Sequence, residues 1–279
     1  MDYVYMRFPE GRAKALTLSY DDGVEQDVRL ISILDKNGIR CTFNLNGGLF
    51  APEGTVYPDG PIHRRMTLRR CAEAYADTGH EVALHGFAHA HMEQLQPLEA
   101  LRDILQDRQE LEAVFDRMVR GMAYPFGSYS DELVEVLRTA GVAYARTTVS
   151  TETFSIPVDW LRMPATCHHN NPRLTELANQ FLDASADGQP MLFYLWGHSY
   201  EFEQNDNWQV IENFADQMGG HADIWYATNM EIYDYVTAFR SLVFSPGMRR
   251  VYNPSGRTVW FALGKDMYQI AGGTHQKLK

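Results

Sequence analysis

Short apolar segments alternate with longer amphipathic ones along most of this chain, and this alternation limits its fold more than any other feature. The apolar segments, expected to be strands, are residues 15–19, 41–45, 81–84, 121–124, 142–146, 191–196 and 224–227. The amphipathic segments, expected to be helices, are residues 27–37, 66–78, 97–118, 131–139, 172–186, 208–218 and 230–240. Strands that alternate with helices in this way form a parallel α/β sheet or barrel.

The segment 241–279 has a different pattern. Three short runs in it resemble strands joined by turns, and they cover residues 250–253, 258–263 and 267–270. We therefore expect two parts: an α/β domain over residues 1–240, and a short β-rich C-terminal extension over residues 241–279 that packs on it.

Composition excludes several classes of partner. The formal net charge is -11 and no basic stripe is present, which argues against binding to nucleic acid or to an anionic membrane surface. No apolar run approaches the roughly 18 residues of a membrane span. Cys41, Cys71 and Cys167 are too far apart for a readable disulfide framework, so we expect buried thiols in a reducing compartment. No signal peptide is visible, so we expect a cytoplasmic protein, and the sequence indicates no oligomeric state.

Asp21 and Asp22 follow the first predicted strand, residues 15–19. Two adjacent carboxylates repel each other, so folding disfavours them unless a cation or a catalytic task requires them. The alternative is a solvated turn, since Asp-Asp-Gly is also ordinary turn chemistry.

His85 and His89 follow the third predicted strand, residues 81–84. Two histidines four residues apart can direct both imidazoles at one ion. With Asp22 as third ligand, they would form a two-histidine, one-carboxylate site that suits zinc, cobalt, nickel or iron. The alternative is a pair of surface or hydrogen-bonded histidines, and His91 competes with His89 as the second ligand.

Two further motifs follow predicted strands. Tyr124-Pro125-Phe126-Gly127 is either a simple turn or a loop whose rings and backbone N–H groups face an opening. Leu195-Trp196-Gly197-His198 places a histidine after a buried strand, either as a general acid or as a hydrogen-bonded loop residue. Because the carboxyl ends of parallel strands meet at one end of an α/β barrel, all these groups are expected to converge.

The order of these motifs resembles the polysaccharide deacetylase family, with the NodB homology domain of carbohydrate esterase family 4, over roughly residues 10–240. The run Gly79-His80-Glu81-Val82-Ala83-Leu84-His85 strengthens the resemblance. It implies an irregular (β/α) barrel of about seven parallel strands and a divalent metal, most often Zn²⁺, used to hydrolyse acetyl groups on sugars. The family roles would be the base for Asp21, the acid for His198, and metal ligands for Asp22, His85 and His89.

The sequence departs from the family pattern at three places. Gly86 replaces a Ser or Thr that braces the loop after the first histidine, so the bracing must come from elsewhere. Ala123 replaces an Arg that pairs with the catalytic Asp, and we expect Arg146, rather than Arg162, to take its place. The fourth motif survives only as Val158-Asp159-Trp160, in which Trp160 is either a pocket wall or a core residue. His168 and His169, nearby, are expected to be exposed loop histidines unless they touch the substrate.

The expected function is metal-dependent removal of N-acetyl groups from an N-acetylated sugar or oligosaccharide, in the form of a soluble glycan fragment. Tyr124, Phe126, Trp160 and Trp196 would contact this substrate, and the backbone N–H of Phe126 would stabilise the oxyanion. Cleavage of O-acetyl esters, or of a non-sugar amide, is an alternative on the same site. A catalytically silent carbohydrate-binding module is an alternative from a different class.

Overall fold

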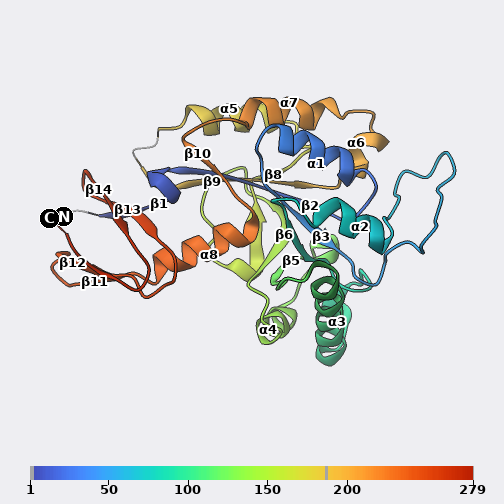
Figure 1. The fold of residues 1–279 in the computed structure, drawn as a ribbon, viewed down its shortest axis with the longest axis horizontal. Helices are drawn as coiled ribbons and strands as arrows, with labels where there is room; N and C mark the ends of the chain where they lie inside the picture. The colour runs from blue at the N-terminus through green and yellow to red at the C-terminus, as the bar shows by residue number, and fades with distance from the viewer. Residues whose placement is uncertain (1–2, 186–187, 279) are drawn as a thin grey trace.

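A computed structural model describes residues 3–185 and 188–278. Figure 1 shows a central set of strands enclosed by helices, with a β-rich part and both termini at one end of the molecule. A long loop between β3 and α2 projects at the opposite end, where α6 also lies (Figure 1).

The central sheet is parallel and has the strand order β7-β6-β5-β4-β3-β2-β9-β8. Its strands are β2 (Lys14–Asp21), β3 (Cys41–Leu45), β4 (Glu81–Leu84), β5 (Gly121–Ala123), β6 (Tyr144–Ser150), β7 (Met163–Ala165), β8 (Cys167–His168) and β9 (Met191–Gly197), and β10 (Ile224–Tyr226) pairs with β2. Only Thr166 separates β7 from β8, so one segment pairs with β6 and then with β9. This segment joins the two ends of the strand order, which gives the irregular α/β barrel that the sequence predicts.

Helices cover the outside of this barrel. They are α1 (Asp27–Lys36), α2 (Leu68–Tyr75), α3 (Pro97–Phe115), α4 (Asp131–Thr139), α5 (Leu174–Asp183), α6 (Tyr200–Gln204), α7 (Gln209–Met218) and α8 (Asn229–Arg240). The short α6 was not predicted, and the predicted end of the fifth helix, Ala186, lies outside the described residues. Short 3-10 turns occupy Pro9–Gly11, Met92–Gln94, Pro125–Gly127 and Trp160–Arg162. Local capping sets the helix ends: the Ser130 side chain, for example, accepts a hydrogen bond from Leu133 N–H.

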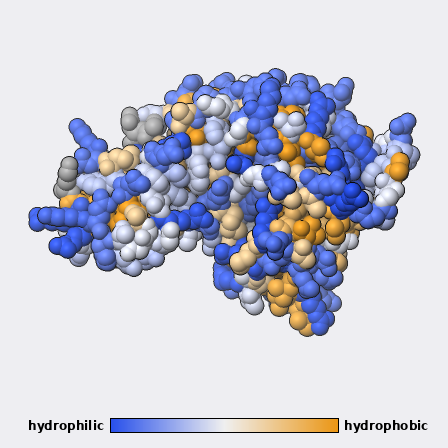
Figure 2. All heavy atoms as spheres, viewed as in Figure 1, coloured by the Kyte–Doolittle hydropathy of each residue, from blue (hydrophilic) through white to orange (hydrophobic). Residues whose placement is uncertain are grey.

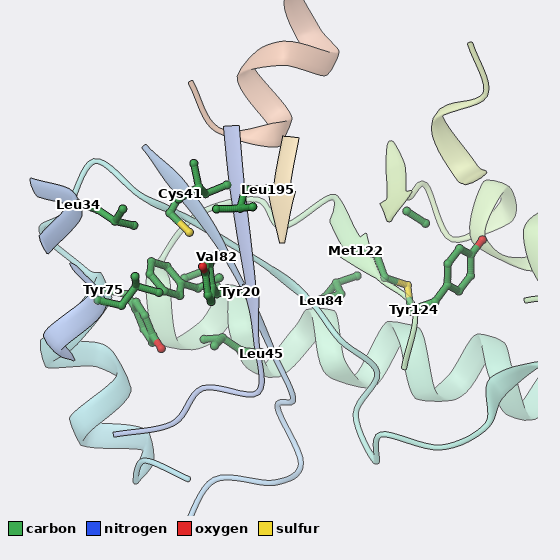
Figure 3. Close-up of a cluster of buried hydrophobic side chains, with 14 of the residues drawn as sticks. Tyr20, Leu34, Cys41, Leu45, Tyr75, Val82, Leu84, Met122, Tyr124 and Leu195 are labelled. Atoms are coloured by element: carbon green, nitrogen blue, oxygen red, sulfur yellow. The ribbon is translucent and has the colours of Figure 1, made fainter. Parts of the chain in front are cut away.

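Alternation along β2 separates the core from the site. Leu16, Leu18 and Tyr20 point outward into the main hydrophobic cluster beneath the helices, which Figure 3 shows around Tyr20 and Cys41. Because successive strand residues face opposite sides, Asp21 points into the barrel. The three cysteines are buried and free, as predicted.

The C-terminal part forms two three-stranded sheets. Their strands are β1 (Val4–Arg7), β13 (Val259–Leu263) and β14 (Asp266–Ile270) in one, and β11 (Val243–Phe244), β12 (Arg250–Tyr252) and β15 (His275–Lys277) in the other. Strand β1 was not predicted from the sequence; it pairs antiparallel with β13 and so brings the N-terminal strand into this part. The division of the chain at residue 240 stays a prediction.

The face of the molecule seen in Figure 2 is mostly polar. Figure 2 shows a largely hydrophilic face with hydrophobic residues gathered towards α3, where Leu98 and Leu105 are exposed. Within the described residues, no helix combines the length and the apolar character that crossing a membrane requires.

Candidate active site

The predicted polar residues meet in one cavity of about 330 Å³ at the carboxyl ends of the parallel strands. It is lined by Asp21, Asp22, His85, His89, Tyr124, Phe126, Gly127, Arg146, Thr148, Trp196, His198 and Tyr200. Nine of the ten residues predicted for the site are among them. Gly127, Thr148 and Tyr200 were not predicted.

Asp22, His85 and His89 present one ligand atom each to a common point. The two Nε2 atoms are 3.2 Å apart, and Asp22 Oδ1 lies 4.0 Å from His85 Nε2 and 3.8 Å from His89 Nε2. Ligand atoms bound about 2.0–2.2 Å from a tetrahedral ion lie about as far apart as the two Nε2 atoms do. Asp22 Oδ1 would need to move only slightly closer to the two histidines to bind the same ion. The three side chains therefore fit a divalent cation.

The hydrogen-bonding of His85 leaves the correct nitrogen free for a metal. Its Nδ1–H donates to the carbonyl of Ala123 at 2.8 Å, so Nε2 carries the lone pair. Burial lowers the pKa of His85 below its ordinary value, and burial together with the neighbouring His85 lowers the pKa of His89 to about 4. Both imidazoles are therefore neutral at neutral pH, as metal ligands must be.

His89, and not His91, completes the triad. The ring of His91 stacks on Phe126 at a centroid distance of 4.0 Å, and its Nδ1 lies 3.4 Å from Glu93. His89 instead has the left-handed backbone angle φ 50°, which turns its ring towards His85.

Two residues that sequence reasoning missed brace the loop after His85. Asp103, on α3, accepts hydrogen bonds from the N–H groups of Phe87 and Ala88 at 2.8 and 3.1 Å. Asn46 Nδ2 donates to the carbonyls of His85 and Gly86 at 2.6 and 2.7 Å. Gly86 has φ +75°, a left-handed angle that favours glycine, so a glycine fits the turn here. Because glycine has no side chain to brace the loop, Asp103 and Asn46 do so. The periodicity of α3 gave no signal for Asp103, because the polar face of a helix is normally solvated.

Asp21 is held by a buried cation. Arg146, on β6, pairs with Asp21 Oδ2, and Asn44 donates to Oδ1 at 2.8 Å. Burial raises the pKa of Asp21, but Arg146 and His85 outweigh burial and hold that pKa below its ordinary value. The Arg146 guanidinium also lies 4.4 Å from the ring centre of Trp196. Arg162, the alternative partner, pairs instead with Asp131 and Asp159.

His198 faces the cavity through Nε2, which lies 3.8 Å from Asp21 Oδ2. Its Nδ1–H donates to Glu201 at 3.0 Å. Burial lowers the pKa of His198, but the hydrogen bond to Glu201 and the charge of Asp21 outweigh burial and raise that pKa above its ordinary value. His198 therefore keeps its proton to a higher pH than a free imidazole does, which suits the acid role predicted for it. Glu201 was not predicted, since α6 is too short to give a periodic pattern.

The prediction that His168 and His169 are exposed was wrong. His169 is 1% exposed, and its Nε2 lies 2.9 Å from Glu201 Oε2. His168 Nε2 lies 3.3 Å from the same oxygen, and its Nδ1 accepts the N–H of Asn170, so Nε2 carries the proton. Both histidines pack around the carboxylate that holds His198.

The structure places Trp160 outside the lining of the cavity. Its ring packs edge-on against Tyr233 at 5.3 Å, with Arg240 5.8 Å from the ring centre. The structure therefore favours the interpretation of Trp160 as a core residue, and it does not support the predicted substrate contact through Trp160.

Aromatic rings form the mouth. Phe126 is 53% exposed and has φ 58°, a left-handed angle that turns its ring outward. Gly127, which follows, cannot be replaced without movement, because a Cβ atom would lie 2.2 Å from Thr148 Cγ2. Tyr124 is buried, and its hydroxyl donates to the carbonyl of Leu161 at 2.8 Å.

Comparisons with known proteins agree with this geometry. Residues 9–145, which include Asp21, Asp22, His85 and His89, match a family model described as polysaccharide deacetylase. A candidate polysaccharide deacetylase from Mycobacterium smegmatis has a TM-score of 0.61 and 17% identity, over 86% of this chain and 96% of that chain. A family 4 carbohydrate esterase from Streptomyces lividans, solved in complex with acetate, has a TM-score of 0.51 and 16% identity, over 77% and 93%. At these identities the structural likeness shows a shared fold. The chain matches no curated protein.

Proposed function

Because the chain belongs to the polysaccharide deacetylase family, we propose that it is a divalent-metal-dependent hydrolase that removes N-acetyl groups from a saccharide. One observation carries this proposal: the ionised carboxylate of Asp22 and the neutral imidazoles of His85 and His89 face one point beside Asp21 and His198 in a single cavity. A base, an acid and a cation site within one pocket are what amide hydrolysis requires.

The side chains divide the reaction between them. A bound cation would supply Lewis acidity for activating water and polarising the acetyl carbonyl. Asp21, ionised beside Arg146, accepts the proton of the attacking water. His198, charged and held by Glu201, donates a proton to the leaving nitrogen. An amine is a poor leaving group unless it is protonated, so N-deacetylation depends on His198 more than ester cleavage does.

The cavity favours a small substrate group. Its volume of about 330 Å³ is at the lower end of the range of ligand pockets, about 300–1,000 Å³. An acetylated sugar unit suits this size, with Phe126 and Trp196 offering apolar faces to the ring. Longer glycans would extend out past the exposed Phe126.

The rival proposal of a silent carbohydrate-binding module rested on the missing arginine of the third motif. Arg146 supplies a guanidinium to Asp21 from a different strand, which removes that argument. O-acetyl ester cleavage on the same site remains the second candidate, because both reactions need the same base and cation.

Acetate release tests the proposal. Purified protein should release acetate from N-acetylated chitooligosaccharides, lose this activity on dialysis against a chelator, and regain it with Zn²⁺, Co²⁺, Ni²⁺ or Fe²⁺. Acetylated xylan fragments, assayed in parallel, separate ester from amide cleavage. Bound metal with no acetate released from any acetylated substrate would favour the silent module.

A further inference from the structure

His63 lies outside every motif discussed above, yet its ring contacts the proposed metal ligand Asp22. It belongs to residues 61–67, the segment, here called the strap, that leads from the projecting loop into α2. His63 Nε2 lies 3.1 Å from Asp22 Oδ2. A carboxylate that binds a metal ion is deprotonated and only accepts hydrogen bonds, so His63 is the donor.

The two oxygens of Asp22 therefore face different partners. Oδ2 accepts from His63, whereas Oδ1 is the oxygen that faces His85 and His89. Arg65 Nη2 also donates to Oδ1, at 3.2 Å, but a carboxylate oxygen has two lone-pair directions and can accept this bond and bind an ion. Because His63 contacts Oδ2, Asp22 is oriented with Oδ1 towards the two histidines, as binding of a shared metal ion requires.

Hydrogen bonds connect the strap to the turn that follows Asp22 and so help to position His63. Glu25 N–H donates to the carbonyl of Arg64 at 2.8 Å, and Met66 N–H donates to the carbonyl of Gly23 at 3.0 Å. Arg64 forms a bidentate pair with Glu203, at 2.7 and 2.8 Å. The ring of His63 packs edge-on against Tyr200, 4.9 Å away.

Asp22 needs this support. Its φ is +86°, a left-handed angle that is uncommon for residues other than glycine, so the turn carrying the proposed ligand is strained. Arg65 Nη1 donates to the Asp22 carbonyl at 2.7 Å and so holds the backbone of the turn. His63 holds its side chain.

We propose that His63 is a positioning residue for the metal site: it orients Asp22 through Oδ2 and does not itself bind the ion. This inference rests on the metal site of the proposed function. His63 does not join the group of three ligand atoms within 4.8 Å of one another, which consists of Asp22, His85 and His89. Groups that hydrogen-bond a ligand in this manner typically change metal affinity about 10- to 100-fold when they are removed.

The test measures Zn²⁺ and Co²⁺ affinity by competition with a chelator, for the wild type and for His63→Ala and His63→Gln. We expect His63→Ala to weaken binding about 10- to 100-fold. His63→Gln should retain much of the affinity, because its side-chain amide can donate to Oδ2. His275→Ala, a histidine of the C-terminal sheets that stacks on Tyr252, is the control and should bind as the wild type does. Since His63 is 40% exposed, unfolding is not expected, and thermal melts check this.

The outcomes separate the two proposals. A wild type that binds no divalent ion overturns the metal site and the role of His63 together. If the wild type binds and His63→Ala binds equally well, only the role of His63 is wrong. The Co²⁺ absorption spectrum gives a third arm: unchanged ligand-field bands in His63→Ala support positioning, and bands that report the loss of a ligand contradict it.

Discussion

Arg146 and Asp21 pair across the barrel interior although they are 125 residues apart in the sequence. Arg146 is 1% exposed and Asp21 is 2% exposed, so the pair is shielded from water. The cation compensates a buried carboxylate that would otherwise be protonated or unstable. This pair favours the ionised form of Asp21, which the proposed role as base requires.

Arg146→Ala is expected to damage both activity and stability. Removing one partner of a buried pair costs about 3–5 kcal/mol, because the other charge remains buried. The pKa of Asp21 should rise, which removes the base at mildly acidic pH. Chemical denaturation and kcat/KM measured against pH check these effects.

Arg162→Ala is the matched control for Arg146. Its guanidinium pairs with Asp159 and Asp131, and the Asp131 side chain is 97% exposed. Exposed pairs contribute about 0–1 kcal/mol, so stability and kcat should remain close to those of the wild type. Equal losses in both variants would contradict the role given to Arg146.

His198→Ala tests the proton donor. We expect kcat to fall about 10²- to 10⁴-fold, the range typical of acid–base catalysis, while metal content stays unchanged. The loss should be smaller with an ester that has a good leaving group. Unaltered kcat on an N-acetylated sugar would exclude His198 from the reaction.

Glu201 should set the basic limb of the pH profile. The pKa of His198 lies above the ordinary histidine pKa of about 6.5, so the imidazole keeps its proton to a higher pH. We expect kcat/KM to fall as the pH rises through this raised pKa. In Glu201→Gln the negative charge is lost and burial dominates, so the pKa of His198 should fall. The basic limb of the profile should therefore move to lower pH by about 1–3 units. Glu212→Gln, which alters an exposed partner of Arg29, should leave the profile in place.

Phe126→Ala tests the aromatic mouth. An aromatic contact contributes about 0.5–1.5 kcal/mol, so KM for an oligosaccharide should rise about two- to tenfold with little change in kcat. Val149→Ala is a suitable control, since Val149 is likewise 53% exposed but does not line the cavity. An unchanged KM in Phe126→Ala would mean that substrates do not pass over this ring.

The sequence predicted the parts of the site that lie at strand ends. Asp21, His85 and His198 each follow an apolar run, and parallel strands bring such positions together whatever the loops do. The arginine was harder to predict, and only the position of Arg146 at the end of the next predicted strand, residues 142–146, favoured it over Arg162.

The supporting residues were not predictable for a physical reason. Asp103 and Glu201 act from helices, and His63 acts from a loop, so their contacts depend on tertiary packing and leave no periodic pattern. Strand β1 was missed because residues 4–7 are stabilised by pairing with β13, more than 250 positions away. His169 was misjudged because a histidine in a polar run looks exposed, whereas stacking on Tyr20 buries it.

Metal stoichiometry tests the central claim most directly. The wild type and Asp21→Asn, stripped with a chelator and then equilibrated with Zn²⁺, should each retain one ion per chain by elemental analysis. Asp22→Ala, His85→Ala and His89→Ala should each lose most of it while keeping the wild-type fold by circular dichroism. A wild type that retains no ion, or three variants that retain it as the wild type does, would contradict a shared cation at these side chains.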